Sequence, residues 1–258
     1  MKFINELIIG LSSYIKAIYL IGKYQLHKYL GLLLLLLLFF LLPVLFFDGM
    51  VSIFLAFIPY SKSAAVGEIA VSFLSGFSGF ILLLMLIPIF TLVSVEVTRR
   101  QEGKIYKFSM VQFSKDIIRG LRITLRNLLL EYLLIAILAI TLFFLPKNSI
   151  TYLVIKFLFI VITSYFYGFS MINYPLENYR YSYKESIHFM HSHIGAAMGI
   201  GIVYYLVISA NNHVYVQQLF GRFTVYWSAF AESLIAFIGV VAASVAISKI
   251  ISKQSIDT

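Results

Sequence analysis

Long apolar stretches alternate with short polar segments along most of the chain. Six stretches stand out, at residues 30–47, 69–95, 128–145, 150–172, 194–210 and 224–247. A helix needs about 20 apolar residues to cross the hydrocarbon core of a membrane. The second stretch meets this length, and the first meets it if its helix starts at Tyr29 or continues past Pro43. We therefore expect long transmembrane helices at 29–47 and 69–95.

The other four stretches form two closely linked pairs. Glu131, Lys156 and Glu232 lie inside them, and a charged side chain within a span is costly unless it faces a polar interior. Short linked apolar segments also fit re-entrant hairpins, which enter the membrane and leave on the same side. The pattern alone allows six spans, or two spans followed by hairpins at 128–172 and 194–250.

The first segment of the chain has a different periodicity. Polar residues such as Asn5 and Lys16 separate apolar residues that recur at helical spacing. The apolar residues are Ile4, Leu7, Ile8, Leu11, Ile15 and Ile18. This pattern is typical of an amphipathic helix that lies in the membrane interface. We expect such a helix over residues 3–28.

Composition extends this interpretation to the whole chain. Of the 258 residues, 61% are apolar and 12% are charged, whereas a soluble domain is about half apolar and about a quarter charged. A soluble fold of this size could not remove so much apolar surface from water. Ordinary soluble enzymes and disordered chains are therefore excluded. The predicted class is an all-α integral membrane protein with a single membrane domain over residues 1–258.

The net charge of +9 is unevenly distributed. Lysines and arginines concentrate in residues 1–28 and 96–127, beside apolar stretches. Nucleic-acid binding needs basic residues along a soluble face, so we expect no nucleic-acid partner. The positive-inside rule instead places both segments on the cytoplasmic side.

The second of these segments is charged along one stripe. Lys115, Arg119, Arg122 and Arg126 follow the spacing i, i+4, i+7, i+11, which aligns them on one face of a helix. The stripe could contact anionic lipid headgroups. It could also concentrate anions at a membrane entrance. Lipid contact is the commoner role for a basic interfacial helix.

Candidates for metal binding and catalysis are few. The chain has no cysteine, which removes thiolate metal ligands and cysteine nucleophiles. His188, His191 and His193 are close in sequence, but on a helix His193 leaves the face that the other two share. We therefore expect solvated histidines and no metal site. Ser75 and Ser78 lie in a glycine-containing apolar run without histidine, so we expect neither enzymatic activity nor a cofactor.

Small residues also repeat at four-residue spacing in the last two stretches. The pairs are Gly195/Gly199, Ala197/Gly201, Gly239/Ala243 and Ala242/Ala246. Such faces let membrane helices approach closely. They predict tight helix packing, and they could also mark an oligomer contact.

One segment carries a specific motif. Residues 172–185 read INYPLENYRYSYKE, with an aromatic–proline pair, an acidic residue, Asn and a basic residue, and an aromatic–basic–Glu group. The segment resembles the signature of the CysZ-type sulfate transporter family. The matching residues are Tyr174, Pro175, Glu177, Asn178, Arg180, Lys184 and Glu185. Other features follow a similar order, with His27-Lys28 where the family has two arginines and Glu96 at the end of the second apolar stretch.

The resemblance implies ATP-independent uptake of sulfate across the bacterial inner membrane. It also implies two long membrane helices with hemi-penetrating hairpins, assembled as dimers or higher oligomers, with the signature segment 173–193 between the hairpins. Glu131, Lys156 and Glu232 would face a polar interior, where Lys156 could pair with a carboxylate. The residues expected to bind the anion are His27, Lys28, Arg119, Arg122 and Arg126.

The chain also differs from the family pattern. It has Asn173 where the family has Asp, and it has His27, His191 and His193 near positions where relatives carry arginine. Histidine is charged only below about pH 6.5. If these histidines contribute, uptake should rise as the pH falls towards 6.

Two functions of different classes fit this sequence. The first is an anion permease or channel for sulfate or a related oxyanion. The second is a non-transporting membrane scaffold with a basic cytoplasmic docking face. In the scaffold, Pro175 would end a helix and Glu177 would pair with Arg180 on the following turn.

Overall fold

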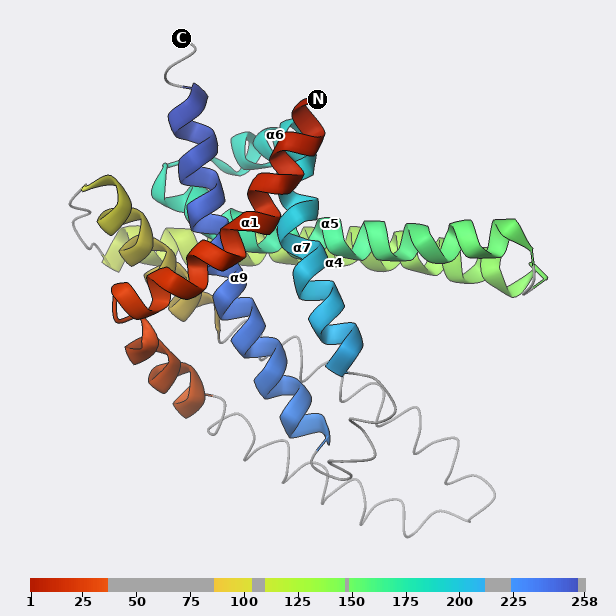
Figure 1. Ribbon diagram of the computed structural model, residues 1–258, viewed down its shortest axis with the longest axis horizontal. Coiled ribbons are helices and arrows are strands. Elements are labelled where there is room, and N and C mark those ends of the chain that lie inside the picture. Colours follow the sequence, from red (N-terminus) through yellow and green to blue (C-terminus); the bar gives the residue numbers. More distant parts are fainter. Residues whose placement is uncertain (37–85, 104–109, 147–148, 212–223, 255–258) are drawn as a thin grey trace.

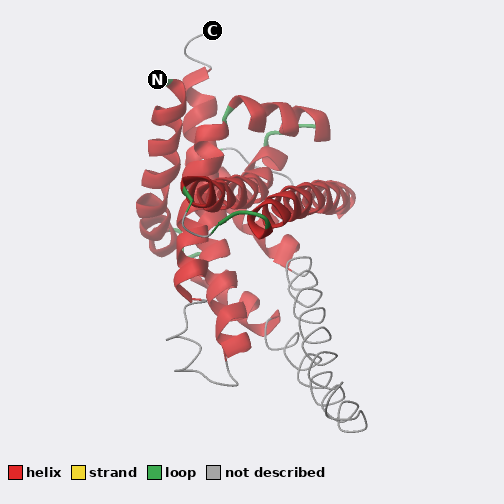
Figure 2. Cartoon of the chain, turned by 90° about the vertical axis from the view of Figure 1, so that its right-hand side faces the viewer, coloured by secondary structure: helices red, strands yellow, loops and turns green. Residues whose placement is uncertain are grey.

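The structure is a computed structural model that describes residues 1–36, 86–103, 110–146, 149–211 and 224–254. All regular structure in these ranges is helical (Figure 2). The labelled helices are α1 (Lys2–Lys23), α4 (Met110–Phe143), α5 (Ile150–Asn178), α6 (Tyr183–Ser192), α7 (Ile194–Asn211) and α9 (Thr224–Gln254). Two further helical segments cover 27–36 and 86–102.

Four of the described helices are long and apolar enough to cross a membrane. They are Lys2–Lys23, Ile118–Leu142, Ile150–Asn178 and Phe230–Lys253. Tyr183–Ser192 and Ile194–Ala210 meet at an angle of 87° and form a fifth candidate if they count as one broken span. The protein is therefore an all-α, multi-pass membrane protein, as the sequence predicts. The expected long helices at 29–47 and 69–95 lie largely outside the described residues.

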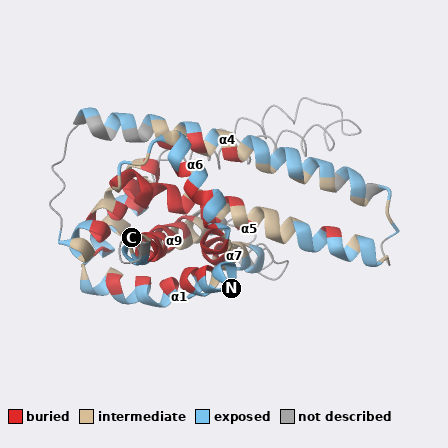
Figure 3. Ribbon diagram, turned by 90° about the horizontal axis from the view of Figure 1, so that it is seen from above, coloured by how far each residue is buried: buried red, intermediate tan, exposed pale blue. Residues whose placement is uncertain are grey.

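The described helices form a packed bundle with a long projecting hairpin. α1 and α9 lie against α7, and the inner half of α5 packs on α7 and α9 (Figure 1). The antiparallel pair α4–α5 then continues well beyond the bundle. Buried residues concentrate where the helices meet, while the outer part of the hairpin is mostly exposed (Figure 3). We call this outer part, residues 129–158, the arm.

The hairpin is longer than the apolar pattern predicts. α4 begins at Met110 and runs without a break to Phe143, so the basic stripe is the first half of this helix and not a separate interfacial helix. At the far end, the Ser149 hydroxyl accepts from the Tyr152 backbone N–H at 3.1 Å and caps α5. Capping by serine stabilises a helix start by about 1 kcal/mol.

α5 continues through Pro175 and ends only at Asn178. The expectation that Pro175 ends a helix is therefore wrong. Proline lacks the N–H for a helical hydrogen bond and crowds the preceding turn. Every residue from Met171 to Asn178 is buried, and this packing holds the last turn helical despite the local cost.

Glycines allow the helices of the bundle to make backbone contact. A Cβ added at Gly199 of α7 would collide with the Leu7 carbonyl of α1, and one at Gly201 would collide with the Ser164 carbonyl of α5. The two small-residue faces of α7 thus pack on two different neighbours. The predicted tight packing is confirmed within the chain, while the oligomer contact stays a prediction.

α1 differs from the expected interfacial helix in its length and in which of its faces is buried. It ends at Lys23, and a new helical segment starts at His27, so the expected single helix to residue 28 is too long. Its packed face contains Glu6, Ile9, Gly10, Ser13, Tyr14, Ala17 and Leu20. The apolar stripe with Ile4, Ile8 and Ile15 is exposed. The small and polar residues thus face protein, and the large apolar ones face outward.

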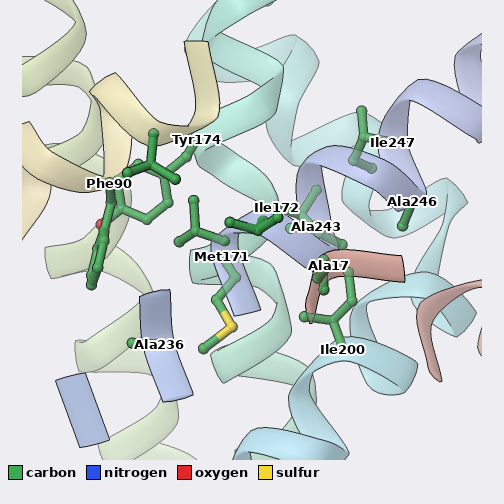
Figure 4. Packing of buried hydrophobic residues seen from close by; sticks show 14 of the residues in the cluster. Ala17, Phe90, Met171, Ile172, Tyr174, Ile200, Ala236, Ala243, Ala246 and Ile247 are labelled. Atoms are coloured by element: carbon green, nitrogen blue, oxygen red, sulfur yellow. The ribbon is translucent and has the colours of Figure 1, made fainter. Parts of the chain in front are cut away.

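The core forms where α1, α5, α7 and α9 meet, beside the 86–102 segment. Ala17, Ile172, Ile200 and Ala243 come together from the four helices (Figure 4). Phe90 and Tyr174 pack edge to face beside them, with ring centroids 5.6 Å apart. The motif residue Tyr174 is thus part of the core.

Candidate functional site

Arg119 links three helices through the start of the motif. Its Nη2 donates to Asn173 Oδ1 at 3.2 Å and to Ser186 Oγ at 2.5 Å. These bonds connect α4 to α5 and α6. Arginine suits such a position because its planar guanidinium directs several donors at once.

Glu177 lies next to this arginine site and is 3% exposed. Its Oε1 accepts from Asn173 Nδ2 and its Oε2 accepts from Thr91 Oγ1, each at 3.4 Å. α4 passes close by at Gly120, where an added Cβ would lie 3.3 Å from Glu177 Oε1. Asn173 therefore bridges a guanidinium and a buried carboxylate, and buried charges need such partners.

Asn178 ties the end of α5 to two other elements. Its Nδ2 donates to Ser94 Oγ at 3.0 Å and to Thr98 Oγ1 at 3.1 Å. The Ser94 hydroxyl lies 3.1 Å from that of Ser244 on α9. Residues 86–102, α5 and α9 are thus held by polar side chains in an otherwise apolar core. We call the set Thr91, Ser94, Thr98, Arg119, Asn173, Glu177, Asn178, Ser186 and Ser244 the motif network.

A second polar group lies at the end of the 86–102 segment. Glu96 contacts Arg99 and Arg100, each at 2.7 Å, and the Arg100 guanidinium lies 5.3 Å from the Tyr24 ring centroid. Burial of the Glu96 carboxyl disfavours its charge, but hydrogen bonds and charges from Arg99 and Arg100 outweigh this effect and lower its pKa. Tyr179 donates to Glu102 nearby.

The second half of the motif builds the connection from α5 to α6. Arg180 is exposed, with φ at 61°, so the expected pairing with Glu177 is replaced by the contacts of Glu177 within the motif network. Ser182 and Glu185 form a capping box at the start of α6. Hydrogen bonds from the Ser182 backbone and side chain lower the pKa of the exposed Glu185 carboxyl. Lys184 is exposed on the same helix.

The expected anion-binding residues do not form one cluster in the described contacts. Arg119 enters the motif network, whereas Arg122 is exposed. Arg126 Nη1 donates to Asn127 Oδ1 at 3.4 Å. His27 and Lys28 are exposed, and the Lys28 ammonium lies 5.1 Å from the Tyr29 ring centroid. The basic stripe therefore has no single environment: Arg119 is half-buried in the motif network and Arg126 is half-buried beside Asn127, whereas Lys115 and Arg122 are exposed.

The three charged residues inside the apolar stretches also differ in their burial. Glu131 and Glu232 are half-buried, whereas Lys156 is exposed on the arm. The Lys156 ammonium lies 4.9 Å from the Tyr152 ring centroid. In the described ranges Lys156 forms no ion pair, so the expected pairing with a carboxylate is wrong there. The reason is position, since Lys156 lies about three helical turns before Tyr167, the α5 residue within electrostatic range of Glu131.

His193 is a candidate residue that the sequence does not reveal. Its Nδ1 lies 2.7 Å from Glu6 Oε1, and both side chains are buried. The Phe189 ring stacks on it with a centroid distance of 4.3 Å. The expectation of solvated histidines is correct for His188 and His191, which are exposed, and wrong for His193. Only the packing of α1 across the α6–α7 bend brings Glu6 to this histidine.

A surface groove of about 450 Å³ runs along α6 beside this pair. Tyr181, Lys184, Glu185, His188, Phe189, Ser192 and His193 line it. Its charges are mixed, with Lys184 and Glu185 on the same rim. Over the described residues, no group of three or more His, Asp or Glu side chains is arranged to hold a metal ion.

Neither protein-family models nor curated proteins give a match to this chain.

Proposed function

We propose that the protein is an ATP-independent permease for a small oxyanion in a bacterial inner membrane, with sulfate as the first candidate. The observation that carries the proposal is the motif network. It places Arg119 and a series of hydroxyl and amide groups inside a bundle of helices that are apolar enough to span a membrane. The resemblance of residues 172–185 to the CysZ-type signature supports the choice of sulfate.

The chemistry of the network fits the needs of an oxyanion. A divalent anion leaves water only where hydrogen-bond donors and positive charge replace its hydration shell. Arg119 supplies the charge, and hydroxyl groups of Thr91, Ser94 and Ser186 lie in the same network. Each of these groups already has a hydrogen-bond partner in the structure, so the anion would exchange with contacts that already exist.

Exposed basic residues supply the approach to this network. Lys28, Lys115 and Arg122 are exposed, and a surface of one sign raises the local concentration of the opposite ion. The same residues suit anionic lipid headgroups. Oligomers are also part of the proposal, since the arm exposes large apolar residues that lipid or a second copy would cover.

The test is flux by the purified protein in liposomes. Wild-type protein should release trapped labelled sulfate faster than empty liposomes do, with phosphate and chloride as competitors. Arg119→Lys keeps the charge but loses the planar set of donors, and it should reduce the flux about tenfold or more. Arg122→Lys is the matched control on the same helix. Proteoliposomes that are no more permeable to sulfate than empty ones would refute the proposal.

The scaffold function has one observation in its favour. Among the described contacts, the motif network joins α4, α5, α6, α9 and the 86–102 segment, which is also how a rigid platform would be built. A scaffold should co-purify with a stoichiometric partner and show no ion flux. Retention of that partner by wild-type protein, together with its loss after substitution of Lys115 and Arg122 by Glu, would favour this second function.

A further inference from the structure

Two half-buried glutamates lie on helices that are apolar enough to span a membrane and are not part of the motif network. Glu131 is on α4 and Glu232 is on α9. Within the described part of the chain, neither carboxyl has an ion-pair or hydrogen-bond partner. Ionisable groups at membrane depth are costly and are usually functional. These two therefore need a physical explanation.

A tyrosine pair places the two carboxyl groups in one region. The rings of Tyr167 on α5 and Tyr204 on α7 meet edge to face with centroids 4.7 Å apart. Each of these tyrosines lies within electrostatic range of both Glu131 and Glu232. Four helices thus converge on the region, and we call it the glutamate cluster.

Two buried polar groups nearby lack partners among the described residues. Asn127 is 2% exposed, and its Nδ2 donates to nothing there. Ser164 is 0% exposed, and its hydroxyl is also unpartnered there. Asn127 lies one turn before Glu131 on α4, and Ser164 lies one turn before Tyr167 on α5, which places each on the same face as its neighbour. A bound water or ion is one way in which buried groups of this kind are satisfied.

The other titratable groups around the cluster carry little compensating charge. Tyr132 of α4, Tyr205 of α7 and Tyr14 of α1 lie within range of the same tyrosine pair, and they are neutral at ordinary pH. Arg126 lies on the motif side of Glu131, where its Nη1 donates to Asn127 Oδ1 at 3.4 Å, so a single guanidinium stands at the edge of the cluster among the described residues. Lys156 is farther out on the arm. The cluster is thus rich in oxygen and poor in positive charge, which suits a small cation.

We propose that Glu131 and Glu232 form a proton-binding site inside the membrane region, with Asn127 and Ser164 holding the associated water. When both glutamates are ionised, two negative charges repel an approaching anion. When the site takes up protons, the carboxyl groups become neutral and the repulsion disappears. Proton binding stands on its own, whereas control of anion flux by this site rests on the proposed permease function.

The first experiment measures proton binding without transport. Infrared difference spectra of the full chain in bilayers, recorded between pH 5 and 8, should show the C=O band of protonated carboxylic acid. Glu131→Gln and Glu232→Gln should each remove part of this band and shift the midpoint of the remaining part, because the two groups interact. Glu185→Gln is the control, since it removes an exposed carboxyl that is not part of the glutamate cluster. Circular dichroism and gel filtration identify any variant that fails to fold, and Glu131→Asp then replaces Glu131→Gln.

The second experiment measures sulfate efflux from liposomes over the same pH range. Wild-type flux should rise severalfold from pH 8 to pH 5.5, and the double variant Glu131→Gln/Glu232→Gln should give a high, nearly pH-independent flux. A carboxyl band that is unchanged in both single variants overturns the proton site. A band that responds to added Na⁺ at fixed pH assigns a metal cation and also overturns it. A normal band with no sulfate flux leaves the proton site in place and refutes the permease.

Discussion

The inner bundle and the arm use the same kind of helix in opposite ways. In the bundle, α5, α7 and α9 bury small residues and polar side chains against one another, with backbones in contact at Gly199 and Gly201. On the arm, the same α5 and its partner α4 expose large apolar side chains. These include Leu129, Leu130, Tyr132, Leu133, Leu134, Ile137, Ile140, Phe144, Ile150, Leu153, Val154, Phe157 and Leu158.

The difference follows from what surrounds each region. Lipid is as apolar as leucine, so apolar side chains gain little by leaving it and helices associate through close packing and hydrogen bonds. The bundle has both close packing and hydrogen bonds between its helices. The arm has an apolar surface on several sides, as expected for a region whose solvent is lipid. High hydropathy is therefore shared by both regions and does not tell which one is packed.

The largest expected effect comes from filling a backbone contact in the bundle. Gly201→Leu would force the side chain into the Ser164 carbonyl, and relief would require α5 and α7 to separate. Overpacking a core costs about 1–3 kcal/mol or more, and separation of two central helices should prevent folding altogether. We expect no monodisperse protein on gel filtration. Ala136→Leu on the exposed side of the arm should purify like wild type. Equal yields for both variants would show that the close contact between α5 and α7 is not needed for folding.

The second-largest effect is expected on the membrane integration of the arm. Leu133 is 58% exposed, and an arginine at the centre of a membrane helix costs about 2.5–3.5 kcal/mol. Leu133→Arg should therefore reduce the membrane-integrated fraction after alkaline extraction by roughly tenfold or more, while Leu133→Met should leave it unchanged. Full integration of the arginine variant would show that water, not lipid, surrounds this part of the arm.

A smaller effect is expected in the motif network. Asn178→Ala removes two hydrogen bonds and leaves Ser94 and Thr98 with fewer partners, which costs about 1–3 kcal/mol. Thermal unfolding of the purified protein should begin several degrees lower. Arg180→Ala changes an exposed neighbour and provides the control. A drop of the same size in both variants would show that the loop, and not the network, sets the stability.

The smallest effect depends on pH. The pKa of Glu96 is lower in the folded chain than its ordinary value of 4.5, so ionised Glu96 stabilises the fold above that value. The contribution is lost as the pH falls through the folded-state pKa. Glu96→Gln should lower the free energy of unfolding by about 1 kcal/mol or less at pH 7, and the difference from wild type should vanish in acid. A difference that stays constant down to pH 3 would assign the effect to packing.

The sequence predicts the helices better than it predicts their partners. Apolar stretches locate α5, α7 and α9, and the small-residue spacing of Gly195 to Gly201 correctly predicts close packing. The end of α5 is missed because burial of the whole last turn outweighs the local effect of Pro175. The start of α4 is missed because a basic segment and an apolar one share a single continuous helix.

For the candidate site, too, the sequence predicts some of the residues but not their contacts. The motif identifies Glu177 and Asn178, and the spacing of basic residues identifies Arg119. Neither pattern shows that Arg119 meets Asn173 and Ser186, which lie 54 and 67 residues away along the chain. His193 and Glu6 are 187 residues apart, and helical periodicity carries no information over such a separation.

Composition and periodicity by themselves determine that this chain is an all-α membrane protein, because only helices or closed barrels satisfy their backbone hydrogen bonds in lipid and the apolar runs are helix-length. Only the tertiary structure decides which charges turn inward. Arg119 joins the motif while Arg122 remains outside, and Glu131 and Glu232 lie within electrostatic range of one tyrosine pair while Lys156 stays on the arm. The physical reason is that a side chain's cost inside a membrane depends on its partners, and those partners come from other helices.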